Sequence, residues 1–267
     1  MKCGFIGAGN MGGAIIKGLV VNKAVDKKEL FFFETSPAIK EERVKELGIV
    51  ACESTKELIE KSNVVFLAVK PNILPTVLQQ NKEYFKENSP LVISMAAGVE
   101  LNKIKENIGY EARIMRIMPN MNAHILKSTT AFCRNNNVTD EEYQKAQELL
   151  FAIGSAFEVE ESKFGVFSAI ASCSPAYVYM FINSLAQAAL KEGMPKATAL
   201  KIAADAVAGS ALMLSSKDVH PLEMADKVCS PAGTTIEGVL KLTECGFENA
   251  VMKAVSASVE KDRMLGK

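Results

Sequence analysis

The chain has 267 residues, and its composition argues against several classes of protein before any motif is considered. Lysine plus arginine and aspartate plus glutamate each number 31, so the net charge is zero, which disfavours a nucleic-acid binder that works through a general basic field. Hydrophobic residues make up 48% and charged residues 23%, as in an ordinary globular protein. No CxxC pair occurs among the six cysteines, and two histidines cannot complete a usual zinc set, so we predict no metal and reduced thiols.

Short apolar runs alternate with helical patterns through the first half of the chain. Strands are expected at residues 3–6, 30–33, 64–68, 91–94, 113–118, 128–133 and 156–160. Helices are expected between them at residues 10–21, 38–47, 101–108 and 139–153, with a further short one at the capping box of residues 54–57. This alternation predicts a Rossmann-like α/β domain, in which a parallel sheet carries helices on both faces.

The sequence is helical almost throughout from residue 164 onward. Residues 164–190 carry no charge and are long enough to cross a bilayer, but their many polar side chains suit a buried helix of a soluble domain better. These side chains include Ser168, Ser172, Ser174, Asn183, Ser184 and Gln187. We therefore expect no membrane partner and, because the first residues do not form a secretion signal, a cytoplasmic protein.

The second half also carries broad apolar faces that are rich in small residues. Alanine, glycine and serine crowd residues 186–189 and 203–211, so these helices can approach one another closely. The faces look too broad for one small domain to cover, which predicts self-association as a dimer or larger homo-oligomer, although a compact monomeric bundle would also bury small residues. The expected division is an α/β domain at residues 1–162 and an all-α domain at residues 163–267.

A glycine-rich turn follows the first expected strand, which ends at Ile6, and opens the first expected helix. It reads GxGxxG and consists of Gly7, Ala8, Gly9, Asn10, Met11 and Gly12. The first glycine permits the tight turn, the second lets a pyrophosphate approach the backbone, and the third lets the helix pack on the strand. Free amides at the start of the helix would face the phosphates, so we predict a dinucleotide site here.

Glu34 ends the second expected strand, where a dinucleotide-binding fold places the acidic residue that holds the adenosine ribose. A carboxylate there favours NADH and repels the 2′-phosphate of NADPH. Thr35 and Ser36 could nevertheless donate to a phosphate, and Lys40 or Arg43 could reach it. The sequence therefore predicts NADPH or NADH as the cofactor without choosing between them.

Two further segments follow expected strands at their C-terminal ends, where open α/β sheets bind their ligands. Small residues in both would leave room for a ribose and a nicotinamide ring. We assign both to the cofactor site, namely Ala68, Val69, Lys70 and Pro71 in the first and Ser94, Met95, Ala96 and Ala97 in the second. The proline turn at residues 118–122, flanked by two asparagines, either faces the same crevice or is purely structural.

The strongest second signal is the segment Cys-Ser-Pro-Ala-Gly-Thr-Thr-Ile at residues 229–236. It is a hydroxyl-rich turn that leads into an expected helix at residues 236–242. Amides at a helix N-terminus bind a carboxylate through hydrogen bonds and the helix dipole, and two threonines can donate to a substrate heteroatom. An ordinary N-cap is the alternative, because threonine is a good cap.

Together these motifs resemble pyrroline-5-carboxylate reductase, the enzyme that reduces a cyclic imine to L-proline in the last step of proline biosynthesis. The resemblance covers residues 3–263 and rests on the glycine turn, AVKP at 68–71, RIMPN at 116–120, SPAYVYMF at 174–181 and CSPAGTT at 229–235. The chain departs from the family at Ala232, where a second glycine is common, and at Cys173 and Ser174, where glycines are also common. A positive φ at Ala232 would strain the loop.

The resemblance implies an NADPH- or NADH-dependent oxidoreductase that acts on a CH–NH bond, with residues 1–162 binding the dinucleotide and residues 163–267 serving substrate binding and dimerisation. The substrate carboxylate would lie on the turn formed by Ser230, Gly233, Thr234 and Thr235. The Thr235 hydroxyl would hydrogen-bond the ring nitrogen, which makes Thr235 the catalytic residue. Glu161 matches a position near the substrate, although the neighbouring Glu160 leaves that register open. A cyclic imine can arrive protonated, so hydride transfer would need mainly positioning.

Three other hypotheses account for part of the sequence. A β-hydroxyacid dehydrogenase would need a lysine early in the long helix, and none occurs between Lys163 and Lys191. Another imine or keto-acid reductase among the related two-domain dehydrogenases would keep most of the motifs. A non-catalytic dinucleotide-binding sensor would keep the glycine turn but would not need the turn at residues 230–235. Of the two histidines, His124 lies nearer the expected crevice and could act directly.

Overall fold

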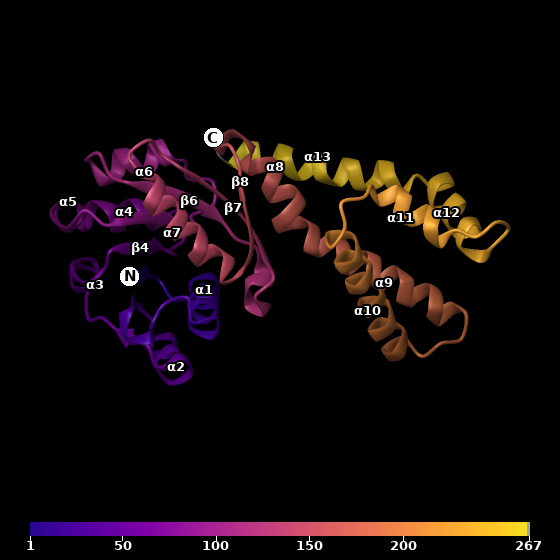
Figure 1. Cartoon of the computed structure of the whole chain (residues 1–267), viewed down its shortest axis with the longest axis horizontal. Coiled ribbons are helices and arrows are strands. Elements are labelled where there is room, and N and C mark those ends of the chain that lie inside the picture. Colours follow the sequence, from indigo (N-terminus) through magenta and orange to yellow (C-terminus); the bar gives the residue numbers. More distant parts are fainter. Residues whose placement is uncertain (266–267) are drawn as a thin grey trace. The chain divides into compact units, whose positions relative to one another are not determined.

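The computed structural model describes residues 1–265 and divides the chain into two compact units (Figure 1). Unit 1 comprises Met1–Ser172 together with the C-terminal end of the last helix, and unit 2 comprises Cys173–Glu260. The sequence places the division at residue 162, where the β pattern stops. Packing keeps the next ten residues with unit 1, because Phe164 and Phe167 are buried in its core.

Unit 1 is built on one eight-stranded sheet with the order β3-β2-β1-β4-β5-β6-β7-β8. The strands are β1 (Cys3–Ile6), β2 (Leu30–Phe33), β3 (Val50–Ala51), β4 (Val64–Leu67), β5 (Leu91–Ser94), β6 (Ile114–Met118), β7 (Ser128–Arg134) and β8 (Gly154–Glu158). Neighbouring strands of the described sheet are parallel apart from β6 and β7, which are antiparallel. The prediction of a Rossmann-like domain is confirmed. The expected parallel sheet departs from the prediction at β6 and β7, because the connection between these two strands is too short to hold a crossover helix.

Helices cover both faces of this sheet, as the alternation of the sequence predicts. They are α1 (Asn10–Val21), α2 (Pro37–Leu47), α3 (Thr55–Lys61), α4 (Leu74–Gln80), α5 (Lys82–Asn88), α6 (Leu101–Ile108), α7 (Asp140–Phe151) and α8 (Phe164–Phe167). Successive strand residues point to opposite faces, so Phe5 of β1 joins the core under α1 and α7, whereas Ile6 joins the core under α3 to α6. Phe5 stacks on Phe66 of β4, with ring centroids 4.4 Å apart.

Three of these elements, β3, α4 and α5, were not predicted from the sequence. The strand has two residues and each helix has seven, which is too short for a periodic pattern to show clearly. Short 3-10 turns complete the unit as η1 (Lys27–Glu29), η2 (Met121–Ile125) and η3 (Glu161–Lys163), and the π-helix η4 (Ser168–Cys173) follows α8.

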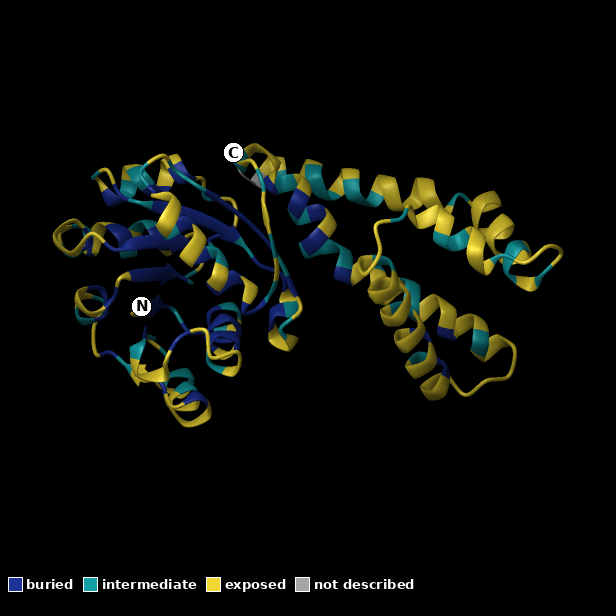
Figure 2. Ribbon diagram, in the orientation of Figure 1, coloured by how far each residue is buried: buried dark blue, intermediate teal, exposed yellow. Residues whose placement is uncertain are grey.

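Unit 2 consists of helices, namely α9 (Ser174–Lys191), α10 (Lys196–Ser215), α11 (Pro221–Val228), α12 (Thr234–Glu244) and α13 (Phe247–Leu265), whose last turn belongs to unit 1. The helices α9 and α10 pack against each other. The Tyr177 hydroxyl shares a hydrogen bond with that of Ser258, which ties α9 to α13. Figure 2 shows these helices mostly exposed, in contrast to the buried strands of unit 1.

Two helical stretches of the described chain, Glu161–Lys191 and Lys196–Ser215, are long and apolar enough to cross a membrane. Core helices of soluble proteins have the same length and hydropathy. The apolar side chains of α9 and α10 therefore need a cover that unit 2 itself does not supply.

Candidate functional site

The glycine turn between β1 and α1 has the conformation that its spacing predicts. Gly7 has a φ of +96°, and a Cβ added to it would lie 2.6 Å from the carbonyl oxygen of Ala68. A Cβ on Gly12 would lie 2.5 Å from the carbonyl oxygen of Gly7, so α1 packs directly on the turn. A Cβ on Gly9 would have no described atom within 4 Å. Gly7 and Gly12 are thus required by the fold itself, whereas the space beside Gly9 is open.

The helix α1 begins without a cap from any described side chain. Gly9 is its N-cap residue, and its first turn, which starts at Asn10, holds no acidic residue. The amides at this end and the positive end of the helix dipole therefore remain available to an anion. The uncapped amides, together with the open space beside Gly9, fit the pyrophosphate of a dinucleotide.

Glu34 follows β2 and folds back onto the glycine turn. Its Oε2 accepts the amide of Ala8 at 2.9 Å, and its Oε1 accepts the amide of Ser36 at 3.1 Å and the hydroxyl of Thr35 at 3.4 Å. Arg43 holds the same turn from α2, because its Nε donates to the carbonyl oxygen of Ala8 at 3.1 Å. The structure therefore brings the predicted ribose-binding carboxylate to the edge of the predicted phosphate-binding turn.

The other two predicted cofactor segments leave the sheet at the same edge as the glycine turn. Pairing sets Ile6 beside Leu67 and Leu67 beside Ser94, so residues 7–12, 68–71 and 94–97 follow three adjacent strand ends. The amide of Ala68 donates to the carbonyl oxygen of Ile6 at 2.9 Å. Ser94 is fully buried, and its hydroxyl accepts the amide of Ala96 at 3.3 Å. The predicted cofactor residues thus gather at one edge of the sheet, at the C-terminal ends of the adjacent strands β2, β1, β4 and β5.

The second predicted site, at residues 229–236, lies in unit 2 at the start of α12. The helix begins at Thr234, two residues earlier than expected, with Gly233 as its N-cap residue and no cap from a described side chain. The amide of Gly233 donates to the carbonyl oxygen of Ser230 at 3.0 Å, and a Cβ on Gly233 would lie 2.2 Å from the Ser230 hydroxyl oxygen. Thr235 is half-buried in the first turn. Ala232 has a φ of +55°, so the strain anticipated at this departure from the family is present.

Glu161 joins three elements of unit 1. Its Oε1 accepts the amide of Leu101 at 2.8 Å, at the start of α6, and Nη1 of Arg116 on β6 at 3.0 Å. The Arg116 side chain is 6% exposed, and its guanidinium lies over the ring of Phe164, 4.6 Å from the centroid. These contacts hold β6, α6 and α8 together, while the role of Glu161 near a substrate stays a prediction.

The proline turn after β6 is held by Asn120, which is buried. Its Nδ2 donates to the carbonyl oxygen of Ala171 in η4 at 2.8 Å, and its Oδ1 accepts the amides of Asn122 and Thr129 at 3.2 and 3.3 Å. The sequence left a structural and a crevice-facing interpretation open, and these contacts favour the structural one. The nearby His124 is exposed on η2.

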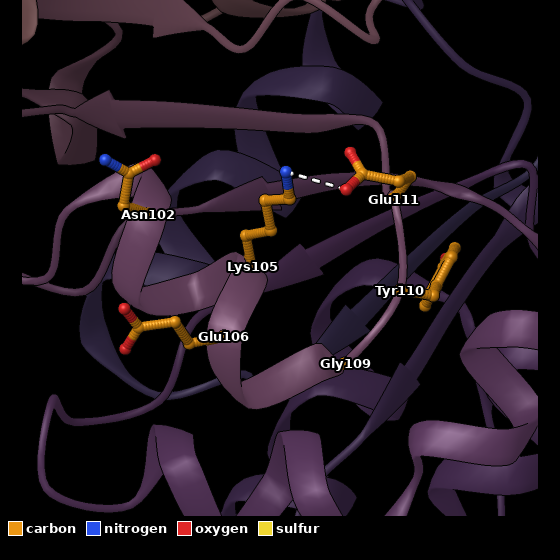
Figure 3. A pocket seen from close by; sticks show the side chains of 6 residues that line it. All are labelled: Asn102, Lys105, Glu106, Gly109, Tyr110 and Glu111. Carbon is orange, nitrogen blue, oxygen red and sulfur yellow. Dashed lines mark ion pairs between the residues drawn. The ribbon is translucent and has the colours of Figure 1, made fainter.

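A surface depression of about 430 Å³ lies at the C-terminal end of α6 and has no connection with these predictions (Figure 3). Its lining residues are Asn102, Lys105, Glu106, Gly109, Tyr110 and Glu111. Lys105 Nζ and Glu111 Oε1 are 2.8 Å apart, and the hydrogen bond from Lys105 lowers the pKa of the Glu111 carboxyl. None of the residues predicted to bind cofactor or substrate, all of which are described, lines this depression. Nor do the described residues include a group of three or more side chains suited to a metal ion.

Two family models match the chain, one in each half. The model for pyrroline-5-carboxylate reductase dimerisation matches residues 161–265. A model described as NADP oxidoreductase, coenzyme F420-dependent, matches residues 2–98, which include the glycine turn and the segment after β4.

Whole-chain relatives agree with these matches. The pyrroline-5-carboxylate reductase of Escherichia coli (strain K12) is 39% identical over 266 residues, with 100% of this chain and 98% of that protein covered. The enzyme of that name from Aquifex aeolicus (strain VF5) is 37% identical over 267 residues, covering 99% and 97%. Among solved structures, the Plasmodium falciparum pyrroline carboxylate reductase with NADP bound has a TM-score of 0.87 at 30% identity, covering 100% of this chain and 98% of that one.

Proposed function

The chain belongs to the pyrroline-5-carboxylate reductase family, and on that premise we propose how its own residues carry out the reduction of 1-pyrroline-5-carboxylate to L-proline. It is an oxidoreductase that uses NAD(P)H. The main support is the 39% identity to the Escherichia coli enzyme. The match covers the whole chain and therefore includes both the predicted cofactor site and the predicted substrate site.

The cofactor site that we propose is the edge of the sheet at the C-terminal ends of β2, β1, β4 and β5. The uncapped amides of α1 would hold the pyrophosphate, and Glu34 would lie at the adenosine ribose. When bound, the reduced nicotinamide supplies the hydride. The residues proposed to contact the cofactor are Ile6, Gly7, Ala8, Gly9, Asn10, Met11, Gly12, Glu34, Thr35, Ser36, Ala68, Val69, Lys70, Pro71, Ser94, Met95, Ala96 and Ala97.

The substrate site that we propose is the start of α12. Its uncapped amides would donate hydrogen bonds to the carboxylate of the ring, with Ser230, Gly233 and Thr234 shaping the turn. The Thr235 hydroxyl would hold the ring nitrogen by a hydrogen bond. A protonated cyclic imine needs no further proton when a hydride adds to its carbon, because the nitrogen keeps its proton in the amine that forms. The protein residues then act mainly by orienting the ring.

The assembly that we propose is a dimer or a larger homo-oligomer formed through unit 2. Exposed apolar side chains on its helices and the dimerisation model that matches residues 161–265 support this. Burial in a subunit interface would also explain why two helices of the chain are long and apolar enough to cross a membrane. We therefore propose a cytoplasmic protein that binds no membrane. Its zero net charge supports the proposal that it binds no nucleic acid.

The reaction is tested by mixing the purified chain with 1-pyrroline-5-carboxylate and either NADPH or NADH, following the absorbance of the reduced cofactor and identifying L-proline by mass spectrometry. We expect cofactor oxidation that depends on the imine, with L-proline formed in equal amount. Cofactor binding without any oxidation would favour the non-catalytic sensor, and turnover of other imines or keto acids alone would favour a related reductase.

The role of Thr235 is tested by Thr235→Ala. We expect kcat/KM for the imine to fall about 100-fold, because the ring nitrogen loses its hydrogen bond in the transition state, with cofactor affinity unchanged. Thr235→Ser keeps the hydroxyl and should restore most of the activity. Thr243→Ala is the matched control, since this threonine of the same helix is exposed and its hydroxyl donates to the carbonyl oxygen of Val239. Wild-type turnover in Thr235→Ala would remove the proposed role.

A further inference from the structure

We propose that this enzyme selects NADH over NADPH, and that Glu34 sets the choice. The inference rests on the proposed function, because it concerns which nicotinamide cofactor the proposed site at the ends of β1 and β2 accepts. Family membership does not decide the question for this chain. The groups around the position of the adenosine ribose, and the partners that those groups already have, favour NADH.

The Glu34 carboxylate is fixed at the edge of the glycine turn. It accepts the amide of Ala8 at 2.9 Å, and Ala8 is fully buried, so turning the carboxylate away would leave that amide without a partner. The amide of Ser36 holds the other oxygen at 3.1 Å. The carboxylate is therefore a fixed negative charge, and it presents only acceptors.

An ionised carboxylate treats the two cofactors in opposite ways. Two oxygens offer about four lone-pair positions, and the donors of Ala8, Thr35 and Ser36 use three of them, so Glu34 can still accept one ribose hydroxyl of NADH. The 2′-phosphate of NADPH is a dianion near neutral pH that also presents only acceptors, and it would face the carboxylate without a donor between them.

The nearby hydroxyl and amide donors that could have offset this repulsion are engaged with Glu34 itself. The Thr35 hydroxyl and the Ser36 amide, which the sequence left open as phosphate ligands, both donate to Glu34 Oε1. A 2′-phosphate would have to compete with the carboxylate for these donors while being repelled by it.

Lys40 and Arg43, the two cations that the sequence offered as ligands of a 2′-phosphate, are engaged as well. Lys40 Nζ lies 2.8 Å from Glu53 Oε1. Arg43 donates from Nε to the carbonyl oxygen of Ala8, and its Nη1 lies 3.0 Å from a carboxylate oxygen of Glu42 and 3.0 Å from one of Glu46. The Arg43 side chain is 15% exposed, so it supports the turn from beneath rather than reaching outward for a phosphate.

Isothermal titration calorimetry with NAD⁺ and with NADP⁺ tests the inference without relying on turnover. We expect the wild type to bind NAD⁺ at least about tenfold more tightly than NADP⁺, since one unfavourable charge contact of this kind corresponds to about a factor of ten. Glu34→Gln removes the charge with little change in shape, and it should reduce the preference about tenfold, chiefly by improving the affinity for NADP⁺.

Glu53→Gln gives an independent variant that leaves Glu34 in place. It frees Lys40, so we expect the affinity for NADP⁺ to rise about two- to threefold and that for NAD⁺ to stay constant. Glu60→Gln is the matched control: Glu60 is an exposed carboxylate that pairs with Lys56 on α3, at 3.8 Å, and neither affinity should change. Thermal unfolding of each variant shows that the comparison is made on folded protein.

A wild type that binds NADP⁺ as tightly as NAD⁺ would overturn the inference, and so would a folded Glu34→Gln protein with an unchanged preference. With 1-pyrroline-5-carboxylate as substrate, the ratio of kcat/KM for NADH to kcat/KM for NADPH should change among the variants in the same direction as the ratio of the two binding affinities. If NAD⁺ binds selectively but no imine is reduced, the proposed reaction fails while the cofactor selection stands.

Discussion

The two units of the molecule treat their apolar residues in opposite ways. In unit 1 large side chains such as Phe5, Phe66 and Phe132 are fully buried between the sheet and its helices. Among the described residues of unit 2, the buried apolar side chains are small ones, Pro175, Ala186, Ala199 and Ala203, whereas its large apolar side chains are partly or largely exposed. Figure 2 shows the helices of this unit mostly exposed. Unit 1 therefore completes its core within one chain, and unit 2 needs a partner surface to cover its own.

Cysteines follow the same contrast. Cys3, Cys52 and Cys133 of unit 1 are buried, and burial raises the pKa of each thiol, to about 12 for Cys3. In unit 2, Cys229 is half-buried and Cys245 is exposed. The burial of the cysteines thus agrees with that of the large apolar side chains: within a single chain, unit 1 has a core that excludes water.

The largest effect is expected from Gly9→Val, which separates ligand binding from folding in unit 1. The new side chain enters the open space beside the glycine turn, so the protein should fold while NAD⁺ affinity falls at least about 100-fold through steric block. Titration calorimetry and thermal unfolding measure the two effects.

Gly12→Val is the matched comparison for Gly9→Val. Its Cβ meets the carbonyl oxygen of Gly7 at 2.5 Å, so it should lower the free energy of unfolding by about 1–3 kcal/mol. Normal NAD⁺ binding by Gly9→Val would remove the glycine turn from the cofactor site.

The next effect concerns the apolar surface of unit 2. Met180 on α9 is 71% exposed in the single chain, and we expect Met180→Glu to dissociate the assembly, because a carboxylate buried at an interface loses its hydration. Light scattering at micromolar concentration gives the mass. Val21→Glu is the control, since Val21 is 54% exposed on α1 of unit 1 and should leave the mass unchanged. A wild type that is already a monomer would contradict the proposed assembly.

Alkaline pH should destabilise the protein through the buried thiols of unit 1. Below about pH 9 the Cys3 thiol is protonated in both the folded and the unfolded state, so it makes no difference to stability. Between about pH 9 and about 12 only the unfolded state ionises, so the free energy of unfolding falls by up to about 1.4 kcal/mol per pH unit. Urea unfolding of wild type and Cys3→Ala at pH 8 and 10 should show a shallower loss in the variant, whereas Cys245→Ala should keep the wild-type dependence.

The smallest effect is expected at the turn before α12. Ala232→Gly relieves a left-handed conformation that costs about 1–2 kcal/mol, but glycine also makes the unfolded chain more flexible by about 0.4–1 kcal/mol. The net result should be a stabilisation of about 0 to 1.6 kcal/mol, seen as a small rise in Tm. Gly233→Ala should lower Tm, because the added Cβ would collide with the Ser230 hydroxyl oxygen. A fall in Tm for Ala232→Gly would show that the turn is not strained.

Local patterns determined much of this protein. The spacing of Gly7, Gly9 and Gly12 predicted a turn in which the outer two glycines are required by the backbone, and the alternation of strands and helices predicted the fold of unit 1. The broad apolar faces beyond residue 164 predicted surfaces that unit 2 cannot bury alone. These features depend on residues close together in the chain, so one sequence suffices to show them.

Contacts between distant residues were decided only by the tertiary structure. The sequence could not show that Glu161 pairs with Arg116, that Asn120 holds η4, or that β7 runs antiparallel to β6. For Glu34 it indicated the carboxylate but not the partners of Lys40 and Arg43, which support the proposed preference for NADH. The hydrogen bonds and ion pairs of a side chain depend on which residues the fold places next to it. Those residues are often distant in the chain, so a local sequence pattern cannot identify them.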